Sequence, residues 1–343
     1  MKALLIKILS DIHANSHPLE LADVPDPMPA EHDLLIKISA CGVCHTELDE
    51  IEGRLPPPVL PVIPGHQVVG VVVETGIAVK AFRKGDRVGV AWIFSACGKC
   101  KYCLAENENL CKDFKGTGRD VNGGYAESIA VNEKFACRIP EQFSDVEAAP
   151  LLCAGAIGYR SLRLTGLRDG DKLGLTGFGA SGHLVLKLVR HPFPHSKVYV
   201  FARNEEERRF ARELGAVWAG DTDDEPPEKL QSIIDTTPVW KTVVAALKNL
   251  EPGGRLVINA IRKEEKDKNS LMQLDYPKHL WQEKEIKSVA NVTRRDVQEF
   301  LTLAAEIHLT PEIEVYNFNR ANEALLDLKM KKIKGAKVLA MAK

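Results

Sequence analysis

Short alternating runs of apolar and polar residues, separated by proline-rich turns, fill the first 150 residues of the chain. The first two runs are residues 3–8 and 33–39, and the pattern continues at 68–74, 86–92 and 128–131. Runs of this length, rich in β-branched residues and bounded by glycine or proline, predict β-strands. No long helical periodicity occurs before about residue 144. We therefore expect a β-rich first domain that forms a partly closed barrel.

The pattern changes after Pro140, where Ser144 or Asp145 is expected to cap a helix. From Lys172 onward, predicted strands alternate with helical segments. The predicted strands are 172–176, 197–202, 216–219, 232–236 and 254–260. Such alternation predicts βαβ units and a parallel sheet. A helix at 297–307 and a strand at 337–341 follow, and this strand is expected to return to the first domain.

A G-x-G-x-x-G motif, formed by Gly177, Gly179 and Gly182, lies between the predicted strand 172–176 and a helix at 183–189. Glycines at this spacing permit a tight turn and let the backbone approach a pyrophosphate at the helix N-terminus. The next strand ends without an acid but with Arg203. An arginine there accommodates the 2′-phosphate of NADP, so the sequence favours NADP(H) over NAD(H). The alternatives are a turn without ligand, and a solvated Arg203 beside NAD(H).

Four of the eight cysteines cluster in one short segment, at Cys97, Cys100, Cys103 and Cys111. Four thiolates in a short lobe predict a closed, tetrahedral zinc site that contributes folding free energy. The spacing suits an iron–sulfur cluster less well, because seven residues precede the last cysteine and Lys112 follows it. A nucleic-acid-binding zinc ribbon is a further alternative.

A second set of candidate ligands begins with Cys44 and His66, which bracket a proline-rich bend. Thiolate and imidazole suit zinc, and a catalytic zinc typically has three protein ligands and one open position. Cys153 is the candidate third ligand, although a cysteine in an apolar helix is more often part of the core. Thr46 is close enough to Cys44 to accept a proton beside the metal. The alternative is a buried structural cysteine and a hydrogen-bonded core histidine.

Composition narrows the classes of partner. At 343 residues, two domains are expected. Lys+Arg number 46 and Asp+Glu 47, so no basic surplus favours nucleic acid or an anionic membrane. No apolar run approaches the ~20 residues of a membrane span. Lys7 interrupts the N-terminal apolar run before it could form a signal-peptide core. A cytoplasmic protein is therefore expected.

Together these motifs resemble the zinc-dependent medium-chain alcohol dehydrogenases, especially the tetrameric type of yeast and bacteria and the cinnamyl-alcohol dehydrogenases. The resemblance covers essentially the whole chain. It rests on Cys44-His45-Thr46, Pro64-Gly65-His66, the four-cysteine lobe, Asn122–Glu127, Leu152–Gly155 and the glycine-rich turn. It implies an α/β fold in which a GroES-like β-rich catalytic domain (1–152 and 290–343) accompanies a Rossmann domain with a doubly wound parallel sheet (153–289).

The resemblance also implies two zinc ions per chain. Cys44, His66 and Cys153 would bind the catalytic ion, and the four-cysteine lobe the structural one. The implied activity is that of an NAD(P)-dependent alcohol dehydrogenase, which interconverts small alcohols and aldehydes or ketones by hydride transfer. A homodimer or homotetramer is implied as well. Polyol or formaldehyde-adduct oxidation, zinc-free enone reduction and a non-catalytic redox sensor are alternatives.

Further roles follow from the resemblance residue by residue. Thr46 would pass the alcohol proton outward and His45 would lie near the pyrophosphate. Trp92 would form a wall of the substrate pocket, unless it belongs to the barrel core.

The chain departs from the family pattern at four positions. Gln67 replaces a glutamate that can approach the metal, and Glu47 replaces an aspartate that orients the ligands. Asp49 stands where a histidine often ends the proton relay, and Ile157 where a threonine often touches the nicotinamide side.

Overall fold

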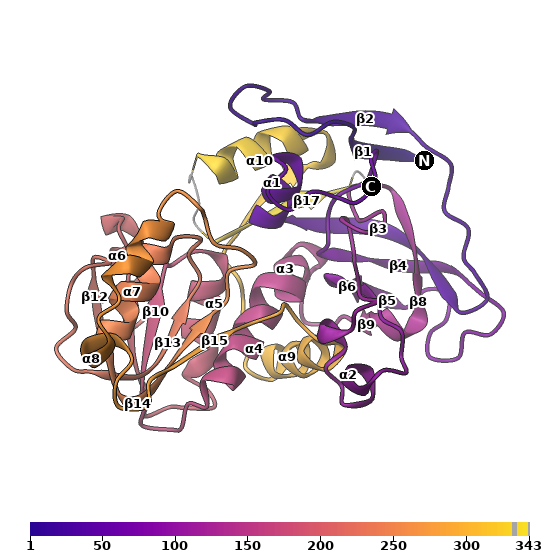
Figure 1. Cartoon of the computed structure of the whole chain (residues 1–343). Coiled ribbons are helices and arrows are strands. Elements are labelled where there is room, and N and C mark those ends of the chain that lie inside the picture. Colours follow the sequence, from indigo (N-terminus) through magenta and orange to yellow (C-terminus); the bar gives the residue numbers. More distant parts are fainter. Residues whose placement is uncertain (331–334, 342–343) are drawn as a thin grey trace. The chain divides into compact units, whose positions relative to one another are not determined.

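The computed structural model describes residues 1–330 and 335–341 (Figure 1). Residues 331–334 and 342–343, which belong to the predicted segment 290–343, lie outside the described residues. The chain divides into two compact units, Met1–Ala156 with Val292–Lys343 and Ile157–Asn291. The domain limits expected from the sequence stay a prediction, and each unit is described by itself. Among the described residues, no helix has the length and apolar character to cross a membrane.

The first unit is built around a seven-stranded sheet in the order β16-β17-β3-β4-β5-β9, with β8 also paired to β3. All predicted strands of this region are present. The long strand β3 connects the sheet, since it pairs with β8 along its start, with β4 along most of its length and with β17 near its end. The strand bounds are β3 Asp33–Val43, β4 Val68–Thr75, β5 Arg87–Val90, β8 Ser128–Asn132, β9 Ala136–Arg138, β16 Ile313–Asn317 and β17 Ala336–Ala340.

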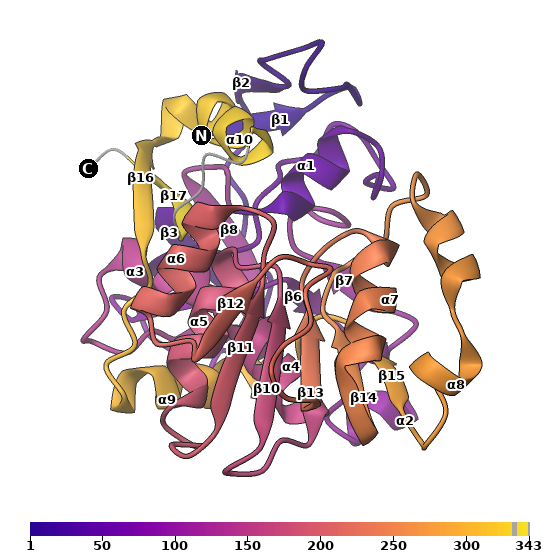
Figure 2. The ribbon, with the colours of Figure 1, turned by 90° about the vertical axis from the view of Figure 1, so that its left-hand side faces the viewer.

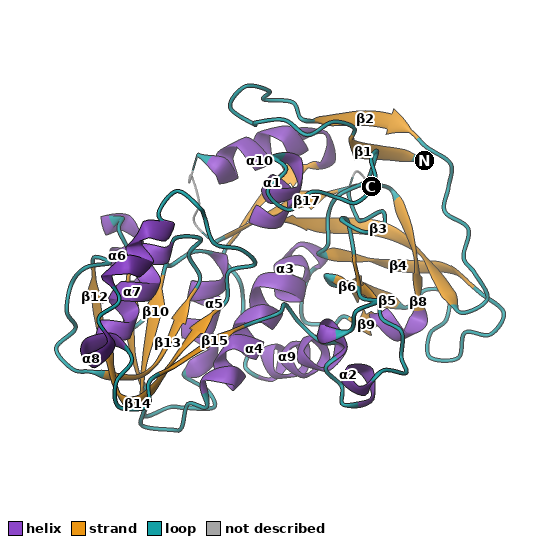
Figure 3. Ribbon diagram, viewed as in Figure 1, coloured by secondary structure: helices purple, strands orange, loops and turns teal. Residues whose placement is uncertain are grey.

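This unit also contains two small two-stranded sheets. Figure 3 shows that strands and loops make up most of the unit. β1 (Lys2–Ile6) pairs with β2 (Leu19–Asp23), and β6 (Ile93–Ser95) pairs with β7 (Lys115–Gly116). Apolar residues that alternate along the strands form one core, because successive side chains of a strand point to opposite faces. Val338 and Leu339 of β17 are fully buried, so the predicted return of the last strand to the first unit is confirmed.

The helices of the first unit are short, apart from α9. Their bounds are α1 His45–Ile51, α2 Lys101–Leu104, α3 Asp145–Pro150, α9 Arg294–Glu306 and α10 Ala321–Lys329, with 3₁₀ turns η1 Glu108–Leu110, η2 Glu133–Phe135 and η5 Phe318–Arg320. The predicted cap of α3 is confirmed, because Ser144 and Glu147 bond to each other's backbone N–H. Pro150 has no N–H to continue the helix. A π-helical turn, η3 (Leu151–Gly155), follows it.

The second unit contains a six-stranded parallel sheet in the order β12-β11-β10-β13-β14-β15 (Figure 2). The chain starts at the central strand β10, moves outward to β12, and returns to the other side of β10. This is the order of a doubly wound sheet, and ligands bind where the direction reverses. The strand bounds are β10 Lys172–Thr176, β11 Lys197–Phe201, β12 Trp218–Gly220, β13 Leu230–Asp235, β14 Leu250–Ile258 and β15 Glu285–Ser288.

Helices cover this sheet through apolar side chains. In the core beside β13 and β14, Val243 and Leu247 of α7 pack with Ile233 and Leu256. The helix bounds are α4 Ala156–Thr165, α5 Ala180–Val189, α6 Glu205–Glu213, α7 Trp240–Asn249 and α8 Tyr276–His279, with a 3₁₀ turn η4 Lys268–Gln273. Both expected architectures, the β-rich domain and the doubly wound sheet, are thus present.

Candidate metal centres and nucleotide-binding turn

The three predicted ligands of the catalytic zinc come together inside the first unit. Cys44 stands between β3 and α1, His66 precedes β4, and Cys153 lies on the π-helical turn. Their ligand atoms all lie within 4.8 Å of one another, and His66 Nε2 is 3.3 Å from Cys153 Sγ. Gly65 makes this placement of His66 feasible: its φ is +98°, and a Cβ there would lie 2.4 Å from the Tyr125 ring.

One buried carboxylate holds two of these ligands. Glu47 Oε1 lies 2.7 Å from His66 Nδ1, and Glu47 Oε2 accepts the Cys44 N–H at 2.7 Å. A carboxylate on Nδ1 orients the ring and leaves Nε2 to the metal. Two sulfurs and one nitrogen, oriented in this way, fit a zinc ion with one open position.

The electrostatics of the cluster favour a thiolate at Cys44. The contact with Cys153 holds the pKa of Cys44 well below its usual value, and the same contact raises the pKa of Cys153. Burial raises the pKa of Glu47 against the opposing charge of His66. Burial alone would lower the pKa of His66, but the charge of Glu47 and the hydrogen bonds of the ring raise it well above the usual range. A cation among these groups would compete with the protons they hold.

Thr46 and Trp92 both lie at this cluster. Thr46 is 6% exposed, and its Oγ1 is 3.6 Å from Cys44 Sγ. The Trp92 ring meets the His66 ring edge-on, with centroids 5.0 Å apart at 87°. Gln67 is buried as well, and a Cβ on Gly42 would lie 2.4 Å from its Oε1, so its amide packs against the backbone of β3.

Asp49 is engaged in a salt-bridge network. Its Oδ1 accepts from Arg54 Nε at 2.7 Å, and Arg54 also pairs with Glu52. Glu52 in turn accepts from Lys329 of α10 at 2.8 Å. The network ties α1 to α10, and it holds the Asp49 carboxylate toward a guanidinium.

The four-cysteine lobe is assembled as predicted, with all four sulfurs within 4.8 Å of one another. Backbone N–H groups point at them: Cys100 N lies 3.3 Å from Cys97 Sγ, and Cys97 N lies 3.5 Å from Cys111 Sγ. The N–H groups of Lys99 and Cys100 lower the pKa of Cys97 to about 6. Burial is the main cause that raises the pKa of Cys103, to about 12. Four convergent sulfurs, in a lobe whose helix α2 buries no residue, fit a closed zinc site.

The glycine-rich turn has the geometry of a dinucleotide site. Gly177 has φ +81°, and α5 begins directly after Gly179. A Cβ on Gly182 would lie 2.8 Å from Gly177 O, whereas a Cβ on Gly179 would meet nothing within 4 Å. The first and third glycines therefore serve packing, and the second leaves open space before the helix N-terminus. This open cradle fits a pyrophosphate.

Arg203 is exposed just beyond the end of β11. The next acid along the chain, Glu205, accepts from Arg208 at 2.8 Å and from Arg212 at 2.7 Å. Glu205 also stands in the first turn of α6. His45 is the first residue of α1, in the other unit.

Sequence reasoning missed two buried acids of the first unit. Glu50 of α1 is fully buried and has no hydrogen-bond partner among the described residues, and burial raises its pKa well above the usual value. Glu108 of η1 is 2% exposed and bonds to Arg294. Neither acid belongs to a recognisable motif. The only sequence signal for Glu50 is its spacing of three from Glu47, which places both on one side of α1.

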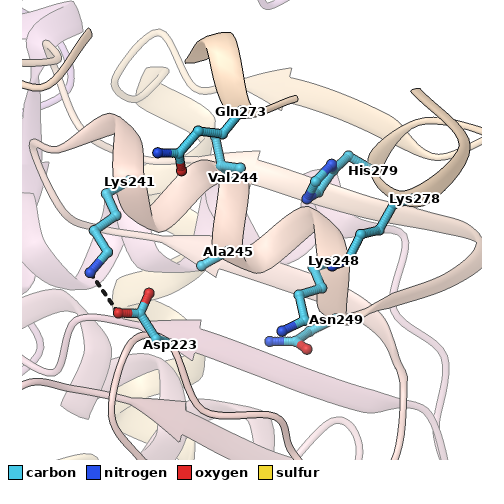
Figure 4. Close-up of a pocket in the computed structure, with 9 residues that line it drawn as sticks. All are labelled: Asp223, Lys241, Val244, Ala245, Lys248, Asn249, Gln273, Lys278 and His279. Carbon is cyan, nitrogen blue, oxygen red and sulfur yellow. Dashed lines mark hydrogen bonds and ion pairs between the residues drawn. The ribbon is translucent and has the colours of Figure 1, made fainter. Parts of the chain in front are cut away.

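A pocket of about 270 Å³ lies in the second unit, and none of the residues that line it is a predicted site residue (Figure 4). Lys241, Lys248 and His279 are among its lining residues, and Lys241 pairs there with Asp223. Two lysines of the pocket are paired to acids, Lys241 to Asp223 and Lys248 to Glu225. We assign this pocket no role in the reaction.

Comparison with known proteins agrees with this arrangement. Residues 30–141 match the alcohol dehydrogenase GroES-like domain. The chain is 43% identical to a probable alcohol dehydrogenase, AdhA, of Mycobacterium tuberculosis, over 94% of this chain and 92% of the relative. It is 34% identical to an alcohol dehydrogenase of Geobacillus stearothermophilus, over 94% and 96%.

Solved structures extend the likeness to the whole fold. A cinnamyl alcohol dehydrogenase of Sorghum bicolor superimposes with a TM-score of 0.84 at 27% identity, covering 99% of this chain and 97% of that one. The Helicobacter pylori cinnamyl alcohol dehydrogenase, solved with NADP(H), gives 0.86 at 25% identity with the same coverage.

Proposed function

Because this chain belongs to the zinc-dependent medium-chain alcohol dehydrogenases, enzymes that interconvert alcohols with aldehydes or ketones, we propose that Cys44, His66 and Cys153 hold its catalytic zinc. The observation that carries the proposal is the contact between Glu47 and His66 Nδ1, which directs His66 Nε2 toward the two sulfurs. When bound, the zinc supplies Lewis-acid chemistry, which lowers the pKa of an alcohol and polarises a carbonyl.

The chain's own groups orient the substrate and move its proton. Thr46 Oγ1 lies beside the sulfur of Cys44, and we assign it the acceptance of the alcohol proton. Asp49, which stands where the family often has the histidine that ends the relay, pairs with Arg54 instead. Trp92 covers His66 and excludes water from one side of the ligands, which makes it our candidate wall of the substrate pocket.

We assign the second zinc to Cys97, Cys100, Cys103 and Cys111, where it would be structural. With all four positions filled by sulfur, no place remains for a substrate. The ion instead fixes a lobe that contributes little core of its own.

For the nucleotide we propose NADP(H), bound at Gly177, Gly179 and Gly182, with Arg203 facing the 2′-phosphate. Two facts support this choice. No acid lies between Phe201 and Arg203, and Glu205 is occupied by Arg208 and Arg212. The family resemblance implies His45 as a contact with the pyrophosphate, and we propose it in that role. The Helicobacter pylori relative, which binds NADP(H), is a further support.

A homodimer or homotetramer is our proposal for the assembly. The family suggests it, and β15 supports it. Within the described residues β15 ends the parallel sheet, and all four of its residues are exposed, so its outer edge is open to pairing.

The test is aldehyde reduction by the zinc-loaded protein, with benzaldehyde and a short aliphatic aldehyde, using NADPH and NADH in parallel. We expect faster turnover with NADPH, and loss of that preference in Arg203→Ala. Cys44→Ser should lose one zinc per chain and all turnover while its circular dichroism stays unchanged. Wild-type turnover in Cys44→Ser would remove Cys44 from the metal site. Faster turnover with NADH would overturn the role of Arg203 and leave the zinc proposal standing.

A further inference from the structure

The four-cysteine lobe is fastened to helix α9 through one buried acid. Glu108 Oε1 accepts the backbone N–H of Arg294 at 3.0 Å and the Nε of the same arginine at 2.8 Å. Glu108 lies three residues before Cys111, whose N–H it accepts at 3.0 Å through its own carbonyl oxygen. Any shift of Cys111 therefore moves the acid that holds Arg294.

The acid sits at a structurally sensitive point of α9. Arg294 is the first residue of the helix, so its N–H has no partner within the helix. A carboxylate at this end also interacts favourably with the helix dipole. Thr293 and Asp296 close a capping box beside it, and both are buried. Glu108 thereby pairs with one of the N–H groups at the start of α9 that the helix itself leaves without a partner.

A second contact of α9 leads to the proposed site of the catalytic zinc. Phe300 lies six residues further along α9 and is fully buried. A Cβ built on Gly155 would lie 2.3 Å from Phe300 Cε1 and 2.5 Å from Cζ, so the ring rests directly on the backbone of the π-helical turn. Cys153 is two residues away on the same turn. Packing as tight as this transmits displacement, because protein interiors contain few voids that could absorb it.

We propose that Glu108 is a positioning residue of the catalytic metal centre. Its contact with Arg294 holds α9 in place, and Phe300 of α9 in turn supports the π-helical turn that carries Cys153. In this way the four-cysteine lobe is coupled to the catalytic site. The inference rests on the proposed zinc site at Cys44, His66 and Cys153. It predicts that disturbing the lobe loosens a metal that the lobe does not bind.

Zinc release to an excess of a chromogenic chelator tests this coupling without measuring activity. In the zinc-loaded wild type we expect two phases, and the phase missing from Cys44→Ser belongs to the catalytic ion. Glu108→Gln keeps the shape of the side chain but removes the charge that holds Arg294. We expect it to speed the catalytic phase about tenfold, the lower end of the effect of groups that support metal ligands.

Two further variants separate coupling from general destabilisation. Phe300→Leu weakens the contact between α9 and the π-helical turn without touching the lobe. It should therefore speed the release of the catalytic zinc and leave the release of the lobe zinc unchanged. Glu106→Gln is the matched control, since Glu106 also joins the lobe to α9, but through an exposed pair with Arg295. It should change neither phase. Melting temperatures recorded beside the release rates ensure that all variants are compared while folded.

The outcomes are distinct. A catalytic phase that stays at the wild-type rate in either Glu108→Gln or Phe300→Leu would overturn the coupling, and so would equal acceleration by Glu106→Gln. A wild type that releases only the zinc of the lobe would instead overturn the proposed catalytic site.

Discussion

Replacing Glu47 with glutamine should weaken the binding of the proposed catalytic zinc while leaving its three proposed ligands in place. Each oxygen of the carboxylate has its own nitrogen partner in the structure: Oε1 lies 2.7 Å from His66 Nδ1 in an ion-pair contact, and Oε2 accepts the Cys44 N–H at 2.7 Å. A carboxylate accepts at both oxygens, whereas an amide accepts at one and donates at the other. In Glu47→Gln one of the two donors must therefore face an NH₂ group in a site that excludes water.

The magnitude follows from this loss. A hydrogen bond to a charged group contributes about 1.5–3 kcal/mol, and leaving a buried donor unpaired costs a similar amount. At about 1.4 kcal/mol per factor of ten, zinc affinity should fall roughly 10- to 100-fold. This agrees with the usual effect of removing a carboxylate that supports a metal-bound histidine.

Competition with a chelator of known affinity measures the change directly, at neutral pH and with the zinc of the lobe counted separately. Glu52→Gln is the control, because Glu52 lies on the same stretch of chain but pairs with Lys329 and Arg54. It should retain wild-type zinc affinity. Wild-type affinity in Glu47→Gln would refute the reasoning, since it would mean that neither donor depends on the charge of Glu47.

Three other changes have defined outcomes. Cys100→Ser should lower the melting temperature and the zinc content by one ion per chain, and unchanged melting would contradict a structural role for the lobe. Gly182→Ala places a Cβ 2.8 Å from Gly177 O. The resulting overpacking, which costs about 1–3 kcal/mol, should distort the turn and raise the nucleotide dissociation constant measured by cofactor fluorescence. The zinc content should stay unchanged. Hydrogen bonds led by Lys172 lower the pKa of Glu228 from 4.5 to about 2. Its contribution to stability is therefore complete above about pH 5 and is lost as the pH falls toward 2. In urea titrations, the stability difference between wild type and Glu228→Gln should shrink over that range, and a difference that persists at pH 2 would show that these bonds act without the charge.

Residue type and spacing are enough to find the two groups of candidate metal ligands that the structure brings together. Cysteine and histidine have few competing roles at such density, and Cys153 can be found because a catalytic zinc requires a third ligand. The glycine-rich turn is equally predictable, since three glycines at this spacing between a strand and a helix seldom serve another purpose than nucleotide binding.

The arrangement around the ligands is beyond the sequence. α1 is only seven residues long and nearly all of it is buried, so it shows no amphipathic period. The contacts of Glu47 with His66 and Cys44, and the ion pair between Asp49 and Arg54, depend on side-chain directions. Residue spacing does not specify these directions. β15 escapes prediction for a related reason, because all four of its residues are exposed and no apolar alternation marks it.

The position of β17 in the first sheet has a consequence for how the chain matures. β17 lies between β16 and β3, yet it is made of residues 336–340, whereas the nucleotide unit is one continuous segment. During synthesis, the nucleotide unit has all its residues while the first sheet still lacks two strands. Until residues 336–340 have been synthesised, β3 exposes an unpaired edge next to Cys44, because its last residues pair with β17. If Cys44 binds zinc as we propose, we expect its site to be completed only after this segment has been synthesised, long after the ligands themselves.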